Sequence, residues 1–237
     1  MSRAVADLTT LANKYGSDKG NKIGEGHGYT FLYELLFHGI RKHRINFLEI
    51  GLALGGPEVG GSVDRAVPSP SVQMWLEYFP HAAIYGFDIC DFAHMEAQHP
   101  RFHFARGDCG SISDLEKLAN SSPRFDVVLD DASHASFHQQ NAFRVLFPRV
   151  APGGLYIIED LHWQSPVYEM CLPAPKTWEF FWSFFVESEY RASPILGPDF
   201  MNQISSQVQS FCPFHDFSGA STSPKLLVFR RSTSSAS

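Results

Sequence analysis

The segment VVLDDASH, residues 127–134, places ionisable side chains directly after an apolar run. The run is typical of a buried strand, and it is followed by Asp130, Asp131 and, three residues later, His134. Carboxylates can hold a cation, and an imidazole can move a proton near neutral pH. Such a cluster indicates a site if other parts of the chain supply its remaining groups.

A second group of such residues follows another apolar run. The stretch GGLYIIEDLHW predicts a strand that ends at Glu159 and Asp160. In a parallel sheet the carboxyl ends of neighbouring strands meet at one edge, so we expect these acids near Asp131. Like charges in a small volume raise each other's pKa unless a cation neutralises them. This crowding favours a hard divalent cation with oxygen ligands.

The elements around these segments indicate an α/β fold. Short apolar strands are predicted within residues 45–56, 82–90, 102–111, 125–131, 153–163 and 223–231. Helical patterns separate most of them, and one of these, residues 111–121, has Ser113 as a candidate N-cap. Strands that alternate with helices predict a doubly wound, mostly parallel sheet covered on both faces.

The ends of the earlier strands favour a cofactor that contains a nucleoside. The first strand runs through Glu49 into the glycine turn EIGLALGG, and the next two end at Asp88 and Asp108. Glycines let a ligand approach the backbone, and an acid after the second strand can bind a ribose diol. The turn is neither a strict GxGxxG nor a P-loop, which disfavours an NAD-dependent dehydrogenase.

Together, FLEIGLALGG, YGFDI, ARGDCGS and FDVVLDDASH…PGGLYIIED resemble class I S-adenosylmethionine-dependent methyltransferases, whose sheet has seven strands, over roughly residues 46–160. In that family these positions hold the methionine part, the ribose and the adenine. The resemblance implies cofactor-binding roles for Glu49, Gly51, Asp88, Asp108 and Cys109, and Asp130 is expected to face the cofactor. Asp88 lies 37 residues after Gly51, where about 20 is usual. An insertion at residues 56–70 accounts for the difference.

More narrowly, YGSDKG…HGYT, SVQMWLEYFP and DDASH…IEDLHW resemble the metal-dependent, mycinamicin-type sugar O-methyltransferases of macrolide biosynthesis. In that group an Asp after the fourth strand and a Glu-Asp pair after the fifth bind Mg²⁺, and a nearby His is the base. The resemblance implies that Asp131, Glu159 and Asp160 bind Mg²⁺ or Mn²⁺ and that His134 is the general base. The residues expected on the substrate side are His138, His162 and Trp163.

The sequence thus predicts an O-methyltransferase that acts on a small-molecule secondary metabolite with vicinal oxygens, either a sugar or a polyketide hydroxyl. Metal coordination lowers the pKa of the hydroxyl, His134 removes its proton, and the oxygen attacks the sulfonium methyl. Two alternatives stay open. A metal-free N- or C-methyltransferase would be active in EDTA, and a fold repurposed for pericyclase-like catalysis would bind the cofactor without forming S-adenosylhomocysteine.

Length, charge and composition narrow the possible classes of partner and the cellular location. The chain has 237 residues, a net charge of −6 and no run of basic residues, so we expect no nucleic-acid partner. No apolar run approaches the length of a membrane span and no secretory signal is evident, which predicts a cytoplasmic protein. Its four cysteines are expected to be reduced and mostly buried. A homo-oligomer is left open.

The chain is expected to form a single methyltransferase domain over residues 1–237. Residues 1–45 form an N-terminal helical or lid segment, 46–160 the cofactor-binding core, and 161–237 an acceptor-side elaboration with the last strand. Lys19, His27 and Tyr29 either reach the carboxylate end of the cofactor or belong to a surface loop. The aromatic stretch 178–190 is expected in the core or a subunit interface rather than in an acceptor pocket.

Overall fold

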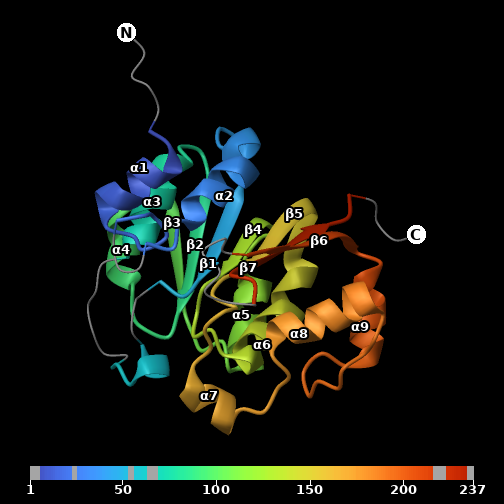
Figure 1. Ribbon diagram of the computed structural model, residues 1–237. Coiled ribbons are helices and arrows are strands. Elements are labelled where there is room, and N and C mark those ends of the chain that lie inside the picture. Colours follow the sequence, from blue (N-terminus) through green and yellow to red (C-terminus); the bar gives the residue numbers. More distant parts are fainter. Residues whose placement is uncertain (1–5, 23–25, 53–55, 63–68, 216–222, 234–237) are drawn as a thin grey trace.

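The computed structural model describes residues 6–22, 26–52, 56–62, 69–215 and 223–233, and these residues form a seven-stranded sheet (Figure 1). Its order is β3-β2-β1-β4-β5-β7-β6. The strands are β1 (Asn46–Ile50), β2 (Ala83–Asp88), β3 (Phe102–Arg106), β4 (Phe125–Asp130), β5 (Val150–Ile158), β6 (Val208–Phe214) and β7 (Leu226–Arg231). β1 to β5 pair in parallel, and β7 runs antiparallel to β5 and β6. The predicted doubly wound, mostly parallel sheet is confirmed.

Helices cover both faces of the sheet. They are α1 (Leu8–Tyr15), α2 (Tyr29–Phe37), α3 (Pro70–Tyr78), α4 (Ala93–Gln98), α5 (Ile112–Ser121), α6 (Ser136–Leu146), α7 (Pro166–Cys171), α8 (Thr177–Trp182) and α9 (Pro198–Ser205). Shorter turns are η1 (His38–Ile40), η2 (Pro57–Val59), η3 (Phe147–Arg149) and the π-helical turn η4 (Ser183–Glu187). In Figure 1, α1 to α4 lie on one side of the sheet and α5, α6 and α8 on the other.

Two hydrophobic cores result from the alternation of side chains along each strand. In β4, Val127 and Leu129 pack on the side of α1, α2 and α3, whereas Val128 packs on the side of α5, α6 and α8. All three side chains are fully buried. Because both faces are covered, the central strands are mainly apolar, and most of their polar residues lie at or near the strand ends.

Side-chain caps fix where several of the helices begin. Asp7 accepts a hydrogen bond from Thr10 N at the start of α1, and Ser69 accepts one from Val72 N at the start of α3. The prediction that Ser113 caps α5 is wrong, because the hydroxyl of Ser111 accepts the hydrogen bond from Asp114 N. The helix begins one residue after Ser111, so Ser113 already lies inside its first turn.

The C-terminal part contributes mainly to the second core. Phe180 and Phe181 of the aromatic stretch are fully buried and pack near Phe229 of β7, which confirms their prediction as core residues. β6 was not predicted, because its sequence VQSFCPF contains a proline and many polar residues. It lies at the edge of the sheet, where a strand residue without an N–H donor is tolerated.

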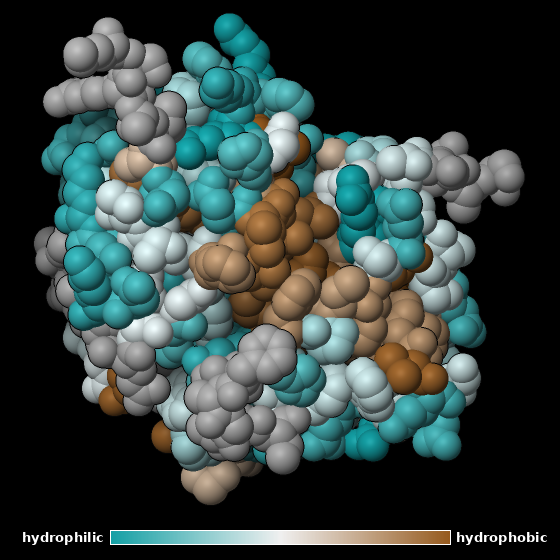
Figure 2. All heavy atoms as spheres, turned by 45° about the horizontal axis from the view of Figure 1, so that its top comes forward, coloured by the Kyte–Doolittle hydropathy of each residue, from teal (hydrophilic) through white to brown (hydrophobic). Residues whose placement is uncertain are grey.

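Part of the molecular surface is apolar. Figure 2 shows apolar side chains gathered in the middle of one face. Among the described residues, Phe31 and Leu35 of α2 are strongly exposed apolar side chains. No helix among the described residues is long and apolar enough to cross a membrane. All four cysteines are free, but Cys171 and Cys212 are exposed, so the prediction of mostly buried thiols is wrong for these two.

Candidate active site

The register of the sheet brings the ends of β1, β4 and β5 side by side. Ile50 pairs with Asp130, and Asp130 pairs with Ile158. The next residue of each strand continues this alignment, since Asp131 N donates to Ile50 O and Glu159 N donates to Asp130 O, both at 2.9 Å. The predicted meeting of the acids at one edge of the sheet is therefore observed.

A cavity opens beside these strand ends. It is lined by Ile50, Gly51, Gly56, Pro57, Phe87, Asp88, Ile89, Cys90, Gly107, Asp108, Cys109, Ala132, Ser133, His138 and Tyr168. Four of the predicted cofactor-binding residues, Gly51, Asp88, Asp108 and Cys109, are among them. Residues 53–55 of the predicted glycine turn and residues 63–68 of the insertion lie outside the described residues.

Gly51 is a position where only glycine fits. Its φ angle of +83° lies in the left-handed region, and a Cβ there would lie 2.6 Å from the Cα of Ala132. The neighbouring residue Leu52 donates its N–H to Asp88 Oδ2 at 2.6 Å, and Cys90 N donates to Asp88 Oδ1 at 2.7 Å. These bonds hold the Asp88 carboxylate in the cavity wall after β2.

His138 lies in this cavity rather than beside the acids of β4 and β5. Its Nδ1 is 2.6 Å from the hydroxyl of Ser133, and its ring lies 4.8 Å from that of Tyr168 on α7. Asp108 stands close by and accepts the N–H of Gly110 at 2.7 Å. Burial lowers the pKa of His138, although the charge of Asp108 opposes this. The substrate-side assignment of His138 stays a prediction, and the residue lines the same cavity as the predicted cofactor-binding residues.

Glu49 and Asp130 are not among the residues that line the cavity. Both are buried, and burial raises the pKa of each carboxyl to about 7. Tyr156 OH donates to Asp130 Oδ2 at 3.4 Å, and Ser71 OH donates to Glu49 Oε2 at 2.8 Å. The other oxygen of Glu49, Oε1, makes no hydrogen bond among the described residues but lies 3.7 Å from Nζ of Lys19.

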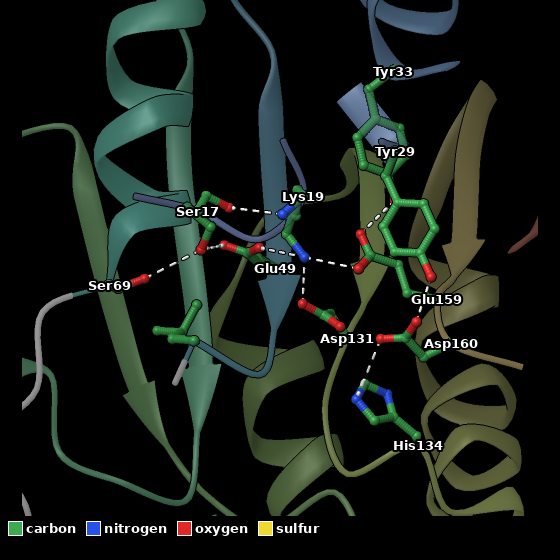
Figure 3. A network of polar contacts seen from close by, with 12 residues as sticks. Ser17, Lys19, Tyr29, Tyr33, Glu49, Ser69, Asp131, His134, Glu159 and Asp160 are labelled. Atoms are coloured by element: carbon green, nitrogen blue, oxygen red, sulfur yellow. Dashed lines mark hydrogen bonds and ion pairs between the residues drawn. The ribbon is translucent and has the colours of Figure 1, made fainter. Parts of the chain in front are cut away.

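Lys19 lies among the buried acids Glu49, Asp131 and Glu159, here called the acid cluster (Figure 3). The sequence did not predict this position. The side chain is 2% exposed and pairs with Asp131, with Glu159 at 2.8 Å and with Glu49 at 3.7 Å. These three acids raise the pKa of Lys19 well above its usual value, although burial opposes the shift. A protein cation from the N-terminal segment thus neutralises part of the charge expected to attract a metal.

Two tyrosines of α2 complete the enclosure of the acids. Tyr33 OH donates to Glu159 and Tyr29 OH donates to Asp160. Burial raises the pKa of both phenols, and the neighbouring acids add to the shift, so both remain protonated donors. Because Lys19 and Tyr33 occupy its two oxygens, Glu159 faces the N-terminal segment.

His134 and Asp160 face each other across the edge of the sheet. His134 Nε2 lies 3.5 Å from Asp160 Oδ2, and Trp163 presents its ring edge-to-face to His134 at 5.6 Å. Trp163 is 38% exposed and is therefore not a core residue. His162 lies on the other side of Asp160, with Nδ1 3.7 Å from Oδ1. Burial lowers the pKa of His162, partly opposed by Asp160.

The residues present fit a divalent cation. Asp131, His134 and Asp160 can each offer a ligand atom, and these atoms lie within 4.8 Å of one another. Glu159 is not in this set, so the predicted trio of acids is only partly assembled around one point. Burial raises the pKa of Asp131 to about 8, although the charge of Lys19 opposes the shift.

The sequence is similar to those of curated O-methyltransferases. No family model matches the chain. It is 41% identical over 161 residues to the 8-demethyl-8-alpha-L-rhamnosyl tetracenomycin-C 2'-O-methyltransferase of Streptomyces olivaceus, covering 67% of this chain and 39% of that protein. It is 37% identical over 158 residues to the mycinamicin VI 2''-O-methyltransferase of Micromonospora griseorubida, covering 65% of this chain and 36% of that protein. The chain therefore spans less than half the length of these curated relatives.

A solved structure supports the same fold. The chain superposes on the MycE methyltransferase of the mycinamycin biosynthetic pathway, crystallised with Mg and S-adenosylhomocysteine, with a TM-score of 0.70 and 25% identity. The match covers 97% of this chain and 54% of that one. The expected class I methyltransferase fold is thereby confirmed.

Proposed function

Because the chain has the class I methyltransferase fold and is homologous to named sugar O-methyltransferases, we propose that it is an S-adenosylmethionine-dependent, Mg²⁺-dependent O-methyltransferase. Its acceptor is a hydroxyl of a small-molecule glycoside that has a second oxygen on the adjacent carbon. The observation that carries the proposal is the position of His134, 3.5 Å from Asp160 and close to Asp131, at the sheet edge that also bears the nucleoside cavity.

The chain's own groups divide into two sets. Gly51, Asp88, Asp108 and Cys109 bind the cofactor in the cavity. Asp131 and Asp160 supply oxygen ligands for Mg²⁺. When bound, the ion lowers the pKa of an acceptor hydroxyl. The glycoside acceptor follows from the relatives, two of which are named for rhamnosyl and olivosyl substrates.

His134 is the general base of the proposed reaction. Its Nε2 faces Asp160 at 3.5 Å, and this contact aligns the ring. His134 removes the acceptor proton while the oxygen attacks the methyl group, and S-adenosylhomocysteine leaves. Trp163 packs edge-on against the imidazole and limits its rotation.

A calorimetric and product assay tests the proposal. S-adenosylhomocysteine is titrated into EDTA-stripped protein, followed by Mg²⁺, and methyl transfer to rhamnosylated and olivosylated acceptors is then measured. We expect cofactor binding without metal, and product formation only with Mg²⁺. Full activity in EDTA would instead support the metal-free N- or C-methyltransferase, and cofactor binding without any S-adenosylhomocysteine formation would support a repurposed fold.

A further inference from the structure

The two oxygens of Asp160 face two different groups of residues. Oδ2 faces His134, whereas Oδ1 faces His162 and accepts the hydroxyl of Tyr29. His27 joins the second group, because its ring lies edge-on to that of His162 at 6.2 Å. His27, Asp160 and His162 can each offer one ligand atom, and these atoms all lie within 4.8 Å of one another.

Backbone hydrogen bonds and ring packing hold His27 and His162 in place. His27 N donates to Asp18 O at 3.1 Å, and its ring stacks on that of Tyr29 at 5.1 Å. His162 lies between two backbone bonds, in which Leu161 N donates to Lys225 O and Trp163 N donates to Asp160 O. The imidazoles are therefore positioned by structure that does not depend on their own polar contacts.

One ring nitrogen of each histidine is buried without a hydrogen-bond partner in the part of the chain that the structure describes. Nδ1 of His27 and Nδ1 of His162 are both buried and make no hydrogen bond among the described residues. A buried polar atom without a partner is costly, and native proteins rarely leave two beside the same carboxylate. A ligand that accepts nitrogen lone pairs would satisfy both.

We propose that His27, Asp160 and His162 form a binding site for a divalent transition-metal ion such as Co²⁺, Ni²⁺ or Zn²⁺. Imidazole nitrogen is a preferred ligand of these ions, whereas Mg²⁺ prefers oxygen. The site adjoins the proposed Mg²⁺ position through Asp160 but uses its other oxygen. It goes beyond the proposed function, and none of its histidines is the proposed base.

The surrounding charge allows such an ion. Four carboxylates, those of Glu49, Asp131, Glu159 and Asp160, lie in one network with Lys19. Lys225 is a further cation near this group, with Nζ 5.9 Å from the centre of the Tyr29 ring. Two protein cations thus stand against four carboxyl groups, and such an environment favours the binding of a further cation.

The test uses the visible absorption of Co²⁺ in the EDTA-stripped full chain. We expect a saturable absorption band that Zn²⁺ abolishes and an equal concentration of Mg²⁺ leaves unchanged. His27→Ala and His162→Ala should each weaken Co²⁺ binding at least about tenfold. His134→Ala should keep the band, and so should His94→Ala, a control at an exposed position on α4.

Other outcomes would overturn the site. If His162→Ala bound Co²⁺ with wild-type affinity, His162 would not be a ligand. If His134→Ala alone lost the band, the ion would bind at Asp131, His134 and Asp160 instead. Displacement by equal Mg²⁺ would show an oxygen-ligand site instead. Thermal unfolding and S-adenosylhomocysteine titration of every variant show that it is folded. If the wild-type chain bound Co²⁺ but not S-adenosylhomocysteine, the metal site would be supported and the proposed function would be contradicted.

Discussion

His134 and Asp160 face each other at 3.5 Å, and both have a left-handed backbone, with φ angles of +58° and +56°. Among the described residues only Ser188 is a further non-glycine residue with positive φ. Such conformations cost about 1–3 kcal/mol each and cluster at functional sites. The two turns that follow β4 and β5 are thus bent so that an imidazole meets a carboxylate.

Replacement of His134 should slow methyl transfer without loss of the cofactor. The imidazole is the only proposed proton acceptor, so His134→Ala should lower kcat by about 10²–10⁴-fold. The cofactor cavity does not include His134, and S-adenosylhomocysteine affinity should therefore be unchanged. Steady-state kinetics and calorimetry measure the two effects. A variant that kept its kcat would remove His134 from the base role.

Loss of the Lys19 charge should destabilise the fold. Lys19→Met leaves Glu49, Asp131 and Glu159 buried without their shared cation, and breaking a buried ion pair costs about 3–5 kcal/mol. Lys14→Met is the matched control, because the Lys14–Glu77 pair is exposed and such pairs contribute little. Urea unfolding of both variants gives the comparison. Equal midpoints would mean that Lys19 does not stabilise the acid cluster.

A side chain at Gly51 should disrupt the turn after β1. Gly51→Ala places a Cβ against the backbone of Asp131 and Ala132 at a φ angle of +83°. We expect a lower melting temperature and at least about fivefold weaker S-adenosylhomocysteine binding, since about one kcal/mol or more of strain is involved. At Gly39 an added Cβ would meet no atom within 4 Å, and the φ angle is not positive. Gly39→Ala should therefore leave the melting temperature and the S-adenosylhomocysteine affinity unchanged. Tight binding by Gly51→Ala would contradict the assignment.

Stability of the ligand-free protein should decrease as the pH rises from about 5 to 7. The pKa of Asp130 is raised to about 7 by burial, but in the unfolded chain it returns to its usual value near 3.8. Between these values the folded state holds the extra proton, so deprotonation favours unfolding. One such acid contributes roughly 1.4 kcal/mol per pH unit in this window.

Thermal unfolding in EDTA measures this pH dependence. Asp130→Asn removes the titrating group and should show a shallower decrease of the melting temperature than the wild type. Asp199→Asn, at an exposed position in the first turn of α9, should follow the wild type. If Asp130→Asn and the wild type had the same slope, the carboxyl of Asp130 would not be the titrating group.

The sequence alone determined the sheet and the edge at which the site lies. Apolar strands that alternate with helices predict a mostly parallel sheet, and the polar residues of such strands gather near their ends. Asp88, Asp108, Asp131 and Asp160 could therefore be placed at one edge by their position after a strand. The edge strand β6 was not predicted, because a half-exposed edge lacks the apolar run that identifies a central strand.

Only the tertiary structure decided which groups face one another. Lys19 lies 112 residues before Asp131 and 140 before Glu159, and no local pattern relates a loop lysine to acids so far along the chain. The fold also separated His138 from His134. His138 lies on α6 and lines the cavity, whereas His134 lies in the turn before α6 and faces Asp160. Chain order fixes which end of a strand a residue occupies, but the docking of the N-terminal segment and the turns after β4 and β5 decide which charges meet.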